Sequence, residues 1–266
     1  MHWQTARYRI DLSRPQVMGI VNITPDSFSD GGRHGDVRSA LAHCERLVRE
    51  GVDILDLGAE STRPGSPPLP LEDERARLLP VLREALGLGV PVSVDTYKPQ
   101  FMREVLDLGA DIVNDIWALR QPGALDAVAD HPLAGVCLMH MHGQPQTMQF
   151  APLVGDALPP VRALLREQTQ ALRARGVASD RICWDPGIGF GKTPAQNFAL
   201  LARQNELLSD DYPLLVGWSR KSSLGAVTGL PVEERLVPSV AAALLAAERG
   251  ARILRVHDVR ETVAAL

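Results

Sequence analysis

Residues 39–57 read SALAHCERLVREGVDILDL and contain the unit whose repetition predicts the fold. Up to Glu50, apolar side chains recur at the spacing of one helix face, and charged side chains lie outside that face. The apolar stripe consists of Ala40, Leu41, Cys44, Leu47 and Val48. Gly51 stands where the helix should end, and the apolar run Asp53–Leu57 follows it. These residues therefore predict a helix followed directly by a strand.

The same unit recurs along the chain. We expect further strands at Val17–Val21, Pro91–Val94, Asp111–Val113, Gly135–Met139, Arg181–Trp184, Leu214–Gly217 and Arg252–Val256. Helical patterns cover Glu72–Leu86, Pro99–Leu108 and Val232–Arg249, and Gly89, Gly109 and Gly176 also follow helical stripes. Alternating strands and helices predict a parallel sheet, and eight strands favour a closed TIM (β/α)₈ barrel over an open doubly wound sheet.

Length and composition agree with one barrel domain. The chain has 266 residues, and a TIM barrel typically takes about 250. Hydrophobic residues make up 45% and charged residues 23%, which excludes disordered, collagen-like and coiled-coil proteins. We expect a single α/β domain over residues 1–266, with Arg7–Leu12 forming part of a short N-terminal hairpin over the barrel floor.

Charge and cysteine content exclude several classes of protein. The formal net charge is −4, so no excess of positive charge favours nucleic acid or a membrane surface as a partner. The three cysteines contain no C-x-x-C pair, which argues against a disulfide framework or a zinc cluster. No apolar run reaches the roughly 18 residues of a membrane span. We therefore expect a cytoplasmic protein.

Polar side chains stand at or beside the end of every expected strand. They are Asn22, Asp56, Asp95, Asn114, Asp115, His140, Asp185, Ser219, Arg255 and His257. The carboxyl ends of barrel strands meet at one face, so these residues should surround a common mouth. The alternative is that each serves as an ordinary cap or turn residue.

Three of these side chains suit a flat nitrogenous ligand. Asp95 and Asn114 end adjacent strands, where a carboxylate beside an amide can recognise the donor and acceptor edge of a heterocycle; a buried ion pair is the alternative for Asp95. Asp185 precedes the glycine-rich residues 187–191, whose backbone can approach such a ligand closely. This segment is not a Walker A loop, because Pro186 stands where that motif needs its first glycine.

Basic and hydroxyl side chains suit an anion. Arg63 lies beside Ser61 and Thr62 after the second strand, and Arg255 and His257 close the last one. Barrels often bind phosphate with the loops after strands seven and eight. The polar loops that follow the first two strands suit lids. His140 and His142 have no third ligand nearby in the sequence, so we expect rim or core residues rather than a metal pair.

The chain resembles the dihydropteroate synthase family over nearly its whole length. The motifs that carry the resemblance are MGIVNITPDSFSDGG, LDLGAESTRPGS, VSVDTYKP, VNDI, LMHMHGQPQTMQ, DPGIGFGKT, GWSRKSSLG and RVHDV, in family order and spacing. The family implies a homodimeric TIM barrel, a transferase of folate synthesis. Its reaction joins 6-hydroxymethyl-7,8-dihydropterin diphosphate to 4-aminobenzoate and releases pyrophosphate. The alternatives are a pterin-barrel methyltransferase and a non-catalytic pterin-binding paralogue.

The resemblance implies a role for particular positions. The implied pterin pocket comprises Asp95, Asn114, Asp185, Gly217 and Lys221, lined by Ile20, Ile116, Met139 and Phe190. The implied diphosphate contacts are Asn22, Thr62, Arg63, Arg255 and His257, with Asn22 also a Mg²⁺ ligand. Phe28, Pro64, Ser219 and Ser222 would frame the aminobenzoate. Asp95, Asp185, Lys221 and Arg255 would carry the catalysis.

Two positions depart from the family pattern. Many members have Phe where this chain has Ile188, and a smaller side chain where it has Trp218. We expect both residues near the mouth, where they would alter its shape. The short tail after His257 also predicts a truncated last helix.

Overall fold

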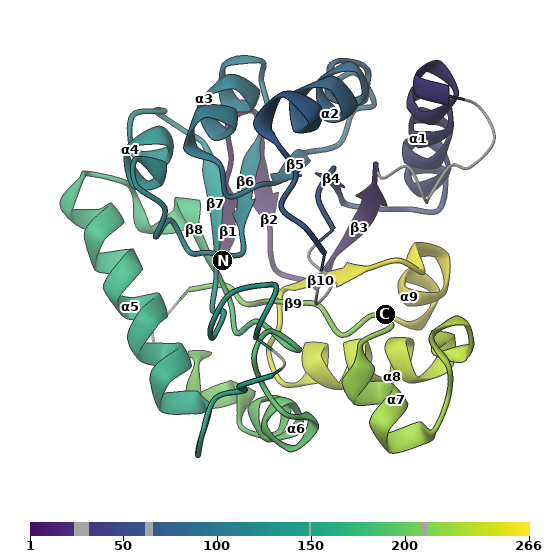
Figure 1. The fold of residues 1–266 in the computed structure, drawn as a ribbon, viewed down its shortest axis with the longest axis vertical. Helices are drawn as coiled ribbons and strands as arrows, with labels where there is room; N and C mark the ends of the chain where they lie inside the picture. The colour runs from purple at the N-terminus through teal and green to yellow at the C-terminus, as the bar shows by residue number, and fades with distance from the viewer. Residues whose placement is uncertain (24–31, 62–65, 149, 209–211) are drawn as a thin grey trace.

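The computed structural model describes residues 1–23, 32–61, 66–148, 150–208 and 212–266. Its strands are β1 (His2–Gln4), β2 (Arg9–Asp11), β3 (Gln16–Asn22), β4 (Ile54–Gly58), β5 (Val92–Asp95), β6 (Ile112–Asp115), β7 (Gly135–Met139), β8 (Ile182–Asp185), β9 (Leu215–Val216) and β10 (Ile253–Val256). Its α-helices are α1 (Gly32–Arg49), α2 (Leu71–Ala85), α3 (Pro99–Asp107), α4 (Ala124–Ala129), α5 (Leu158–Ala174), α6 (Pro194–Ala202), α7 (Ser222–Thr228), α8 (Leu236–Glu248) and α9 (Val259–Ala265). In Figure 1 the helices surround the strands.

The predicted TIM barrel is confirmed. Within the described residues, eight parallel strands pair in the order β8-β7-β6-β5-β4-β3-β10-β9. A parallel bridge between Trp184 and Leu214 joins the two ends of this order, and the Trp184 N–H donates to the carbonyl of Pro213 at 2.9 Å. The sheet therefore closes on itself, and the alternative of an open doubly wound sheet is wrong.

The predicted N-terminal hairpin covers the barrel floor. Strands β1 and β2 pair antiparallel, and the Trp3 indole donates to the carbonyl of Arg181 at 3.0 Å, immediately before β8. Trp3 is fully buried in a cluster with the first inward-facing residues of the barrel strands. That cluster contains Ile10, Leu12, Met18, Ile54, Ile112, Cys137, Cys183, Leu215 and Ile253. The hairpin thus closes the amino end of the barrel, opposite the predicted mouth.

Most strand and helix boundaries fall within two residues of the sequence expectation. Gly51, Gly89, Gly109 and Gly176 all have φ between 80° and 106°, as expected for residues that end helices. The last long helix is shorter than predicted, because Val232–Glu234 forms a 3₁₀ turn and α8 begins at Leu236. Pro238 favours this start, since it then stands in the first turn of α8, where a proline costs no backbone hydrogen bond. The final helix α9 has seven residues.

Among the described residues, no helix combines the length and apolar composition that crossing a membrane requires.

Candidate active site

The candidate site lies directly above the floor cluster. Successive side chains of a strand point to opposite sides, so the residue two positions after each floor residue also points into the barrel. These second inward positions are Ile20, Asp56, Asn114, Met139, Asp185, Gly217 and Arg255. Six of these seven residues carry an implied role in the pterin pocket or the diphosphate site; the exception is Asp56. The barrel therefore brings residues from seven strands into one layer.

Strand register places the expected partners side by side. Asp95 is paired with Asn114 across β5 and β6, and Met139 with Asp185 across β7 and β8. Asn22 is paired with Gly58, which is in turn paired with Asp95. The carboxylate and the amide predicted to recognise a heterocycle edge are thus neighbours on one wall of the mouth.

Arg255 connects two carboxylates across the barrel interior. Its Nε donates to Oδ2 of Asp56 at 2.6 Å, and its Nη2 donates to Oδ2 of Asp95 at 2.8 Å. Asn114 Nδ2 donates to the same Asp56 oxygen at 3.3 Å. Burial opposes the charge on Arg255, but Asp56 and Asp95 together raise its pKa. Two residues assigned to different subsites, Asp95 and Arg255, therefore form an ion pair in this structure.

Asp185 lies against the glycine-rich loop. Its Oδ1 accepts the N–H of Gly187 at 2.7 Å. Burial raises the pKa of Asp185 to about 6, against the effects of that hydrogen bond and of the nearby cations Lys221, Lys192 and Arg255. A buried carboxylate with one oxygen held by a backbone N–H keeps its other oxygen available as an acceptor.

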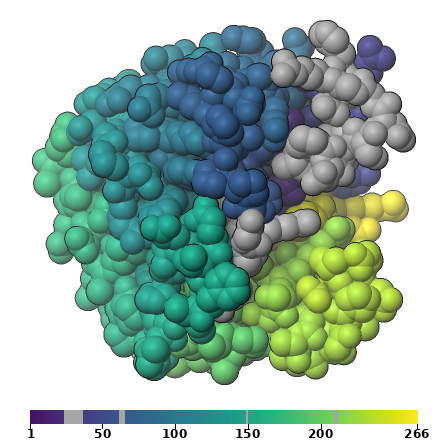
Figure 2. Space-filling model, viewed as in Figure 1, coloured from purple at the N-terminus to yellow at the C-terminus, as the bar shows by residue number. Residues whose placement is uncertain are grey.

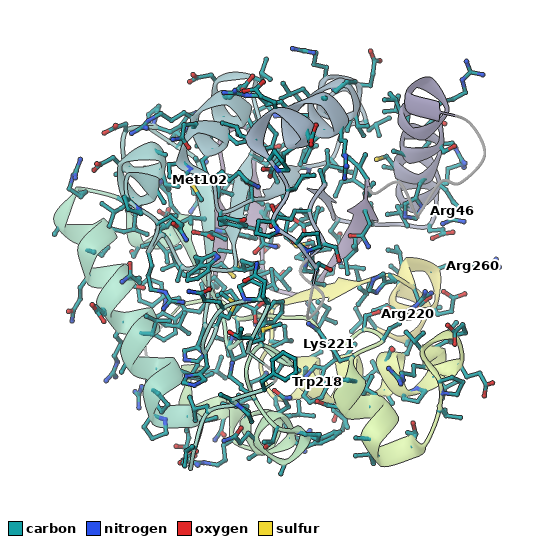
Figure 3. The ribbon with its side chains drawn as sticks, viewed as in Figure 1. Arg46, Met102, Trp218, Arg220, Lys221 and Arg260 are labelled. Atoms are coloured by element: carbon teal, nitrogen blue, oxygen red, sulfur yellow. The ribbon has the colours of Figure 1, made fainter. Side chains whose placement is uncertain are left out.

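Lys221 lies over the face of Phe190, with Nζ 4.3 Å from the ring centre. Burial and the charge of Arg255 lower the pKa of Lys221 to about 8, while Asp185 and Asp95 oppose that shift. Figure 3 labels Lys221 close to Trp218, in the segment between β9 and α7. An ammonium group between an aromatic face and two carboxylates suits contact with a ring acceptor.

Ser219 and His257 form a hydrogen-bonded pair at the mouth. Ser219 Oγ lies 2.9 Å from the imidazole Nδ1 of His257 and accepts the backbone N–H of the same residue at 3.2 Å. Burial and Arg255 lower the pKa of His257 to about 3, so its imidazole is neutral near pH 7. His257 is therefore a neutral hydrogen-bonding residue, and Arg255 carries the charge at this end of β10.

An apolar cluster lines one side of the mouth. It contains Ile116, Met139, Met141, Met148 and Phe190, with Tyr97 and Trp117 packed against it. Ile116, Met139 and Phe190 are the lining residues that the resemblance implies, and the structure brings them together. Flat apolar side chains beside convergent polar groups are typical of small-molecule sites.

For the other expected site residues, the structure gives either exposure alone or no description. Asn22 is exposed at the end of β3, and Ser222 is exposed as the first residue of α7. Phe28, Thr62, Arg63 and Pro64 lie outside the described residues.

A magnesium site at Asn22 fits the donor chemistry there. The Asn22 side chain offers an amide oxygen at the mouth, where its strand neighbour Gly58 adjoins Asp95. Mg²⁺ is commonly held by one or two protein oxygens together with substrate phosphate oxygens and water. Among the described residues, no group of three or more His, Cys, Asp or Glu side chains is arranged to hold a metal ion. The geometry therefore suits a metal ion shared with a phosphate ligand.

The expectation that Ile188 and Trp218 shape the mouth is wrong. Ile188 is 2% exposed and Trp218 is 1% exposed, and both belong to the core between the sheet and its helices. Trp218 packs on Phe198 of α6, with ring centres 5.1 Å apart. Because each side chain points into that core, substitution there changes packing rather than the shape of the pocket.

Asp115 and His140 also have structural roles. Both oxygens of Asp115 accept backbone N–H groups, from Trp117 at 2.8 Å and Leu119 at 2.7 Å. Burial lowers the pKa of His140 to about 3, and its backbone N–H donates to the carbonyl of Asp185. Sequence reasoning placed Asp56 among the residues around the mouth but gave it no specific contact, although its place two residues after Ile54 marks it as inward-facing.

The comparisons with known proteins agree with this geometry. Residues 18–257 match the family described as pterin binding enzyme. The dihydropteroate synthase of Neisseria meningitidis serogroup B is 48% identical over 270 residues, which cover 99% of this chain and 95% of that protein. The chain belongs to the dihydropteroate synthase family. It is therefore an enzyme of the transferase class.

Solved structures of family members have the same fold. The Xanthomonas albilineans enzyme with 4-aminobenzoic acid superposes with a TM-score of 0.93 at 48% identity, covering 100% of this chain and 96% of that one. The Burkholderia cenocepacia enzyme complexed with 7,8-dihydropteroate gives a TM-score of 0.90 at 51% identity, covering 99% and 93%.

Proposed function

We propose that this chain joins 6-hydroxymethyl-7,8-dihydropterin diphosphate to 4-aminobenzoate, giving 7,8-dihydropteroate and pyrophosphate. The bond between the exocyclic CH₂ carbon and the diphosphate oxygen breaks, and both electrons leave with pyrophosphate. The aminobenzoate nitrogen forms the new bond to that carbon and releases a proton to solvent. The pterin ring can delocalise positive charge, so loss of pyrophosphate precedes attack by the amine.

The wall formed by Asp95, Asn114 and Asp185 binds and orients the pterin ring. Carboxylate oxygens accept the ring amino and N–H groups and favour the positive charge that develops as the diphosphate departs. Lys221 donates to a ring acceptor, and Phe190 packs on the ring face. The register pairing of Asp95 with Asn114 and the 4.3 Å contact between Lys221 and Phe190 support this arrangement.

The diphosphate lies on the side of Arg255, His257, Asn22, Thr62 and Arg63. Arg255 stabilises the departing negative charge, and the neutral His257 imidazole adds a hydrogen bond. Mg²⁺ held by Asn22 would supply further charge neutralisation for the diphosphate. Ser219 and Ser222, together with Phe28 and Pro64, frame the aminobenzoate. The loops expected to act as lids, residues 24–31 and 62–65, lie outside the described residues. As lids they would exclude water, which would otherwise capture the cation.

The observation that carries this proposal is the single layer of Asp56, Asn114, Asp185 and Arg255 above the barrel floor, with Asp95 ion-paired to Arg255. The test is pyrophosphate release from the pterin diphosphate with and without 4-aminobenzoate. We expect release that requires the amine and yields dihydropteroate in equal amount. Steady-state release at the same rate without 4-aminobenzoate would overturn the proposal. No release would also overturn it, and would favour the methyltransferase or the non-catalytic paralogue.

A homodimer is the proposed assembly, through the outer face of α7 and α8. The α8 sequence LVPSVAAALLAAE is apolar nearly all round, and such helices are usually buried. Val237 is 72% exposed and Leu245 42%, on the same side of α8, while Val227 of α7 is 68% exposed. Figure 2 shows this yellow-green region as a broad surface. Light scattering should give twice the chain mass, and Val237→Glu with Leu245→Glu should give monomers.

Two further expectations stand as proposals. A single domain over residues 1–266 is supported by the hairpin packed on the barrel floor. A cytoplasmic location is supported by Cys44, Cys137 and Cys183, which are free and buried.

A further inference from the structure

Lys192 is a buried cation that the proposed reaction does not use. Lys192 is 2% exposed. Its Nζ donates to three backbone carbonyls, those of Gly187 at 2.8 Å, Phe190 at 3.2 Å and His140 at 3.3 Å. An ammonium group has three donors, so all three are used. Two of the carbonyls belong to the glycine-rich loop, and the third follows strand β7. Lys192 therefore ties this loop to the barrel wall.

The glycine-rich loop packs so closely on the segment after β7 that side chains at Gly187 and Gly191 would not fit. Gly187, Gly189 and Gly191 have φ of 68°, 81° and 66°, in the left-handed region that favours glycine. A Cβ at Gly187 would overlap the carbonyl oxygen of His140, and one at Gly191 would overlap that of His142. The loop backbone thus packs directly on the segment after β7, at the place where Lys192 binds both.

This loop carries one face of the pterin pocket. Phe190 lies under the Lys221 ammonium, and a Cβ at Gly189 would lie 3.2 Å from Cδ of Lys221. Asn197 provides a second anchor, because its Oδ1 accepts the Gly189 N–H at 3.0 Å and its Nδ2 donates to Ser223 Oγ at 2.9 Å. Ser223 lies two residues after Lys221. The two anchors hold Phe190 and Lys221 in a fixed relation.

Lys192 also acts on Asp185 through its charge. Burial lowers the pKa of Lys192 itself to about 7 against the effect of Asp185, so the ammonium acts on Asp185 in the pH range of the acid limb. Asp185 faces three cations, Lys221 from the start of α7, Lys192 from the loop and Arg255 from β10, and all three lower its pKa against the effect of burial. The neighbouring titratable groups on β7 and just after it are the Cys137 thiol, whose pKa burial raises, and His140, which is neutral. Removing the Lys192 charge should therefore raise the pKa of Asp185.

We propose that Lys192 is a positioning residue of the pterin pocket: its ammonium holds the glycine-rich loop so that Phe190 and Lys221 meet the pterin ring. This inference rests on the proposed function, and different results would contradict the function and the positioning role. A wild-type enzyme without turnover contradicts the function. An active wild type with an unaffected Lys192 variant contradicts the positioning role.

The experiment compares Lys192→Met with Arg181→Met. Arg181 is an apt control, because it is 5% exposed and lies immediately before β8, at the opposite end of the barrel. Its guanidinium donates to four carbonyls that precede β7, those of Val128, His131, Pro132 and Ala134. Both variants lose a buried cation that binds several carbonyls, so both should have a lower Tm. Steady-state kinetics with each substrate varied and the pH profile of kcat/KM separate a positioning role from a structural one.

We expect Lys192→Met to raise KM for the pterin diphosphate and lower kcat, reducing kcat/KM on the order of tenfold to a hundredfold, because small displacements of binding groups have effects of this size. The acid limb of the profile should move to higher pH. Arg181→Met should keep both parameters within about twofold and the limb unmoved. Equal kinetic losses in the two variants, or wild-type kinetics in Lys192→Met, would overturn the proposal.

Two milder variants cover the case in which Lys192→Met does not fold. Lys192→Gln keeps two donors for the three carbonyls and should give a smaller rise in KM. Ser223→Ala removes the hydrogen bond at the second anchor while changing one buried atom, and it should raise KM for the pterin diphosphate severalfold with little effect on KM for 4-aminobenzoate. An unchanged KM in Ser223→Ala, with the Lys192 variants unfolded, would also contradict the proposal.

Discussion

Asp56 and Arg255 form a 2.6 Å ion pair inside the barrel, although 199 residues of sequence separate them. Asp56 is fully buried, and the same Oδ2 atom accepts the amide of Asn114. One carboxylate oxygen therefore orients a residue proposed to bind diphosphate and another proposed to bind the pterin ring. Its second oxygen, Oδ1, is buried with no hydrogen-bond partner among the described residues. Such an orphaned acceptor suits a polar group of a bound ligand.

Replacing Asp56 with Asn should reduce kcat/KM about tenfold or more, because Arg255 loses the charge that fixes its orientation. Asp53→Asn is the matched control. Asp53 forms a 2.6 Å ion pair with Arg14 at the barrel floor, just before the same strand β4. Steady-state kinetics should show a change below about twofold for that variant. Equal effects from the two substitutions would contradict an orienting role for Asp56.

Asp185→Asn should lower kcat/KM by about 10² to 10³ while the fold survives, since one preorganised group at a developing charge contributes roughly 3 kcal/mol. Asp115→Asn is the comparison, because Asp115 is another buried carboxylate of the same sheet whose oxygens bind backbone N–H groups. It should lower Tm and leave kcat/KM of the folded protein within about threefold. A loss below about threefold in Asp185→Asn would remove the proposed role.

The pH profile of kcat/KM for the pterin diphosphate should be bell-shaped. Burial raises the pKa of Asp95 to about 7 and the pKa of Asp185 to about 6, so activity should fall as the pH drops through these values and the acceptor carboxylates are protonated. Burial lowers the pKa of Lys221 to about 8, so activity should fall above that pH as the ammonium loses its proton. Lys221→Met should lose the alkaline limb and keep the acid one. A profile that stays flat across these pKa values would contradict the roles proposed for the carboxylates and for Lys221.

Gly187→Ala tests the tight packing of the glycine-rich loop against a glycine with a similar backbone. Gly187 and Gly176 both have positive φ, 68° and 84°, but only at Gly187 would a Cβ overlap another atom, whereas nothing lies within 4 Å at Gly176. Gly176→Ala should lower the free energy of unfolding by about 1–2 kcal/mol. Gly187→Ala should lower it by about 3 kcal/mol or more, because overpacking adds to the backbone strain. Denaturant unfolding measures both, and equal losses would refute the packing argument.

The fold could be predicted because its signals are local. The stripe ending at Val48, the helix end at Gly51 and the strand that follows lie within twenty residues, and this unit repeats. The converging strand ends then follow from the barrel itself, so the grouping of Asn114, Asp185 and Arg255 was accessible from sequence.

Contacts across the barrel interior were not accessible in this way. The pairing of Arg255 with Asp56 depends on the reach of the arginine side chain and on which inward-facing side chains meet across the barrel, and no local pattern encodes either. The same cause explains the error at Ile188 and Trp218, which lie beside the mouth in sequence but point into the helix–sheet core. Lys192 belongs to the motif DPGIGFGKT, yet its three carbonyl partners are brought together only when the loop is folded.

A crystal structure with 6-hydroxymethyl-7,8-dihydropterin diphosphate bound tests the assignment of the mouth most directly. We expect the ring edge within hydrogen-bond distance of Asp95, Asn114 and Asp185, its face on Phe190, and the diphosphate beside Arg255 and His257. A ring bound elsewhere, for example beside the hairpin at the floor, or one in the mouth that leaves all three polar side chains without contact, would contradict the assignment.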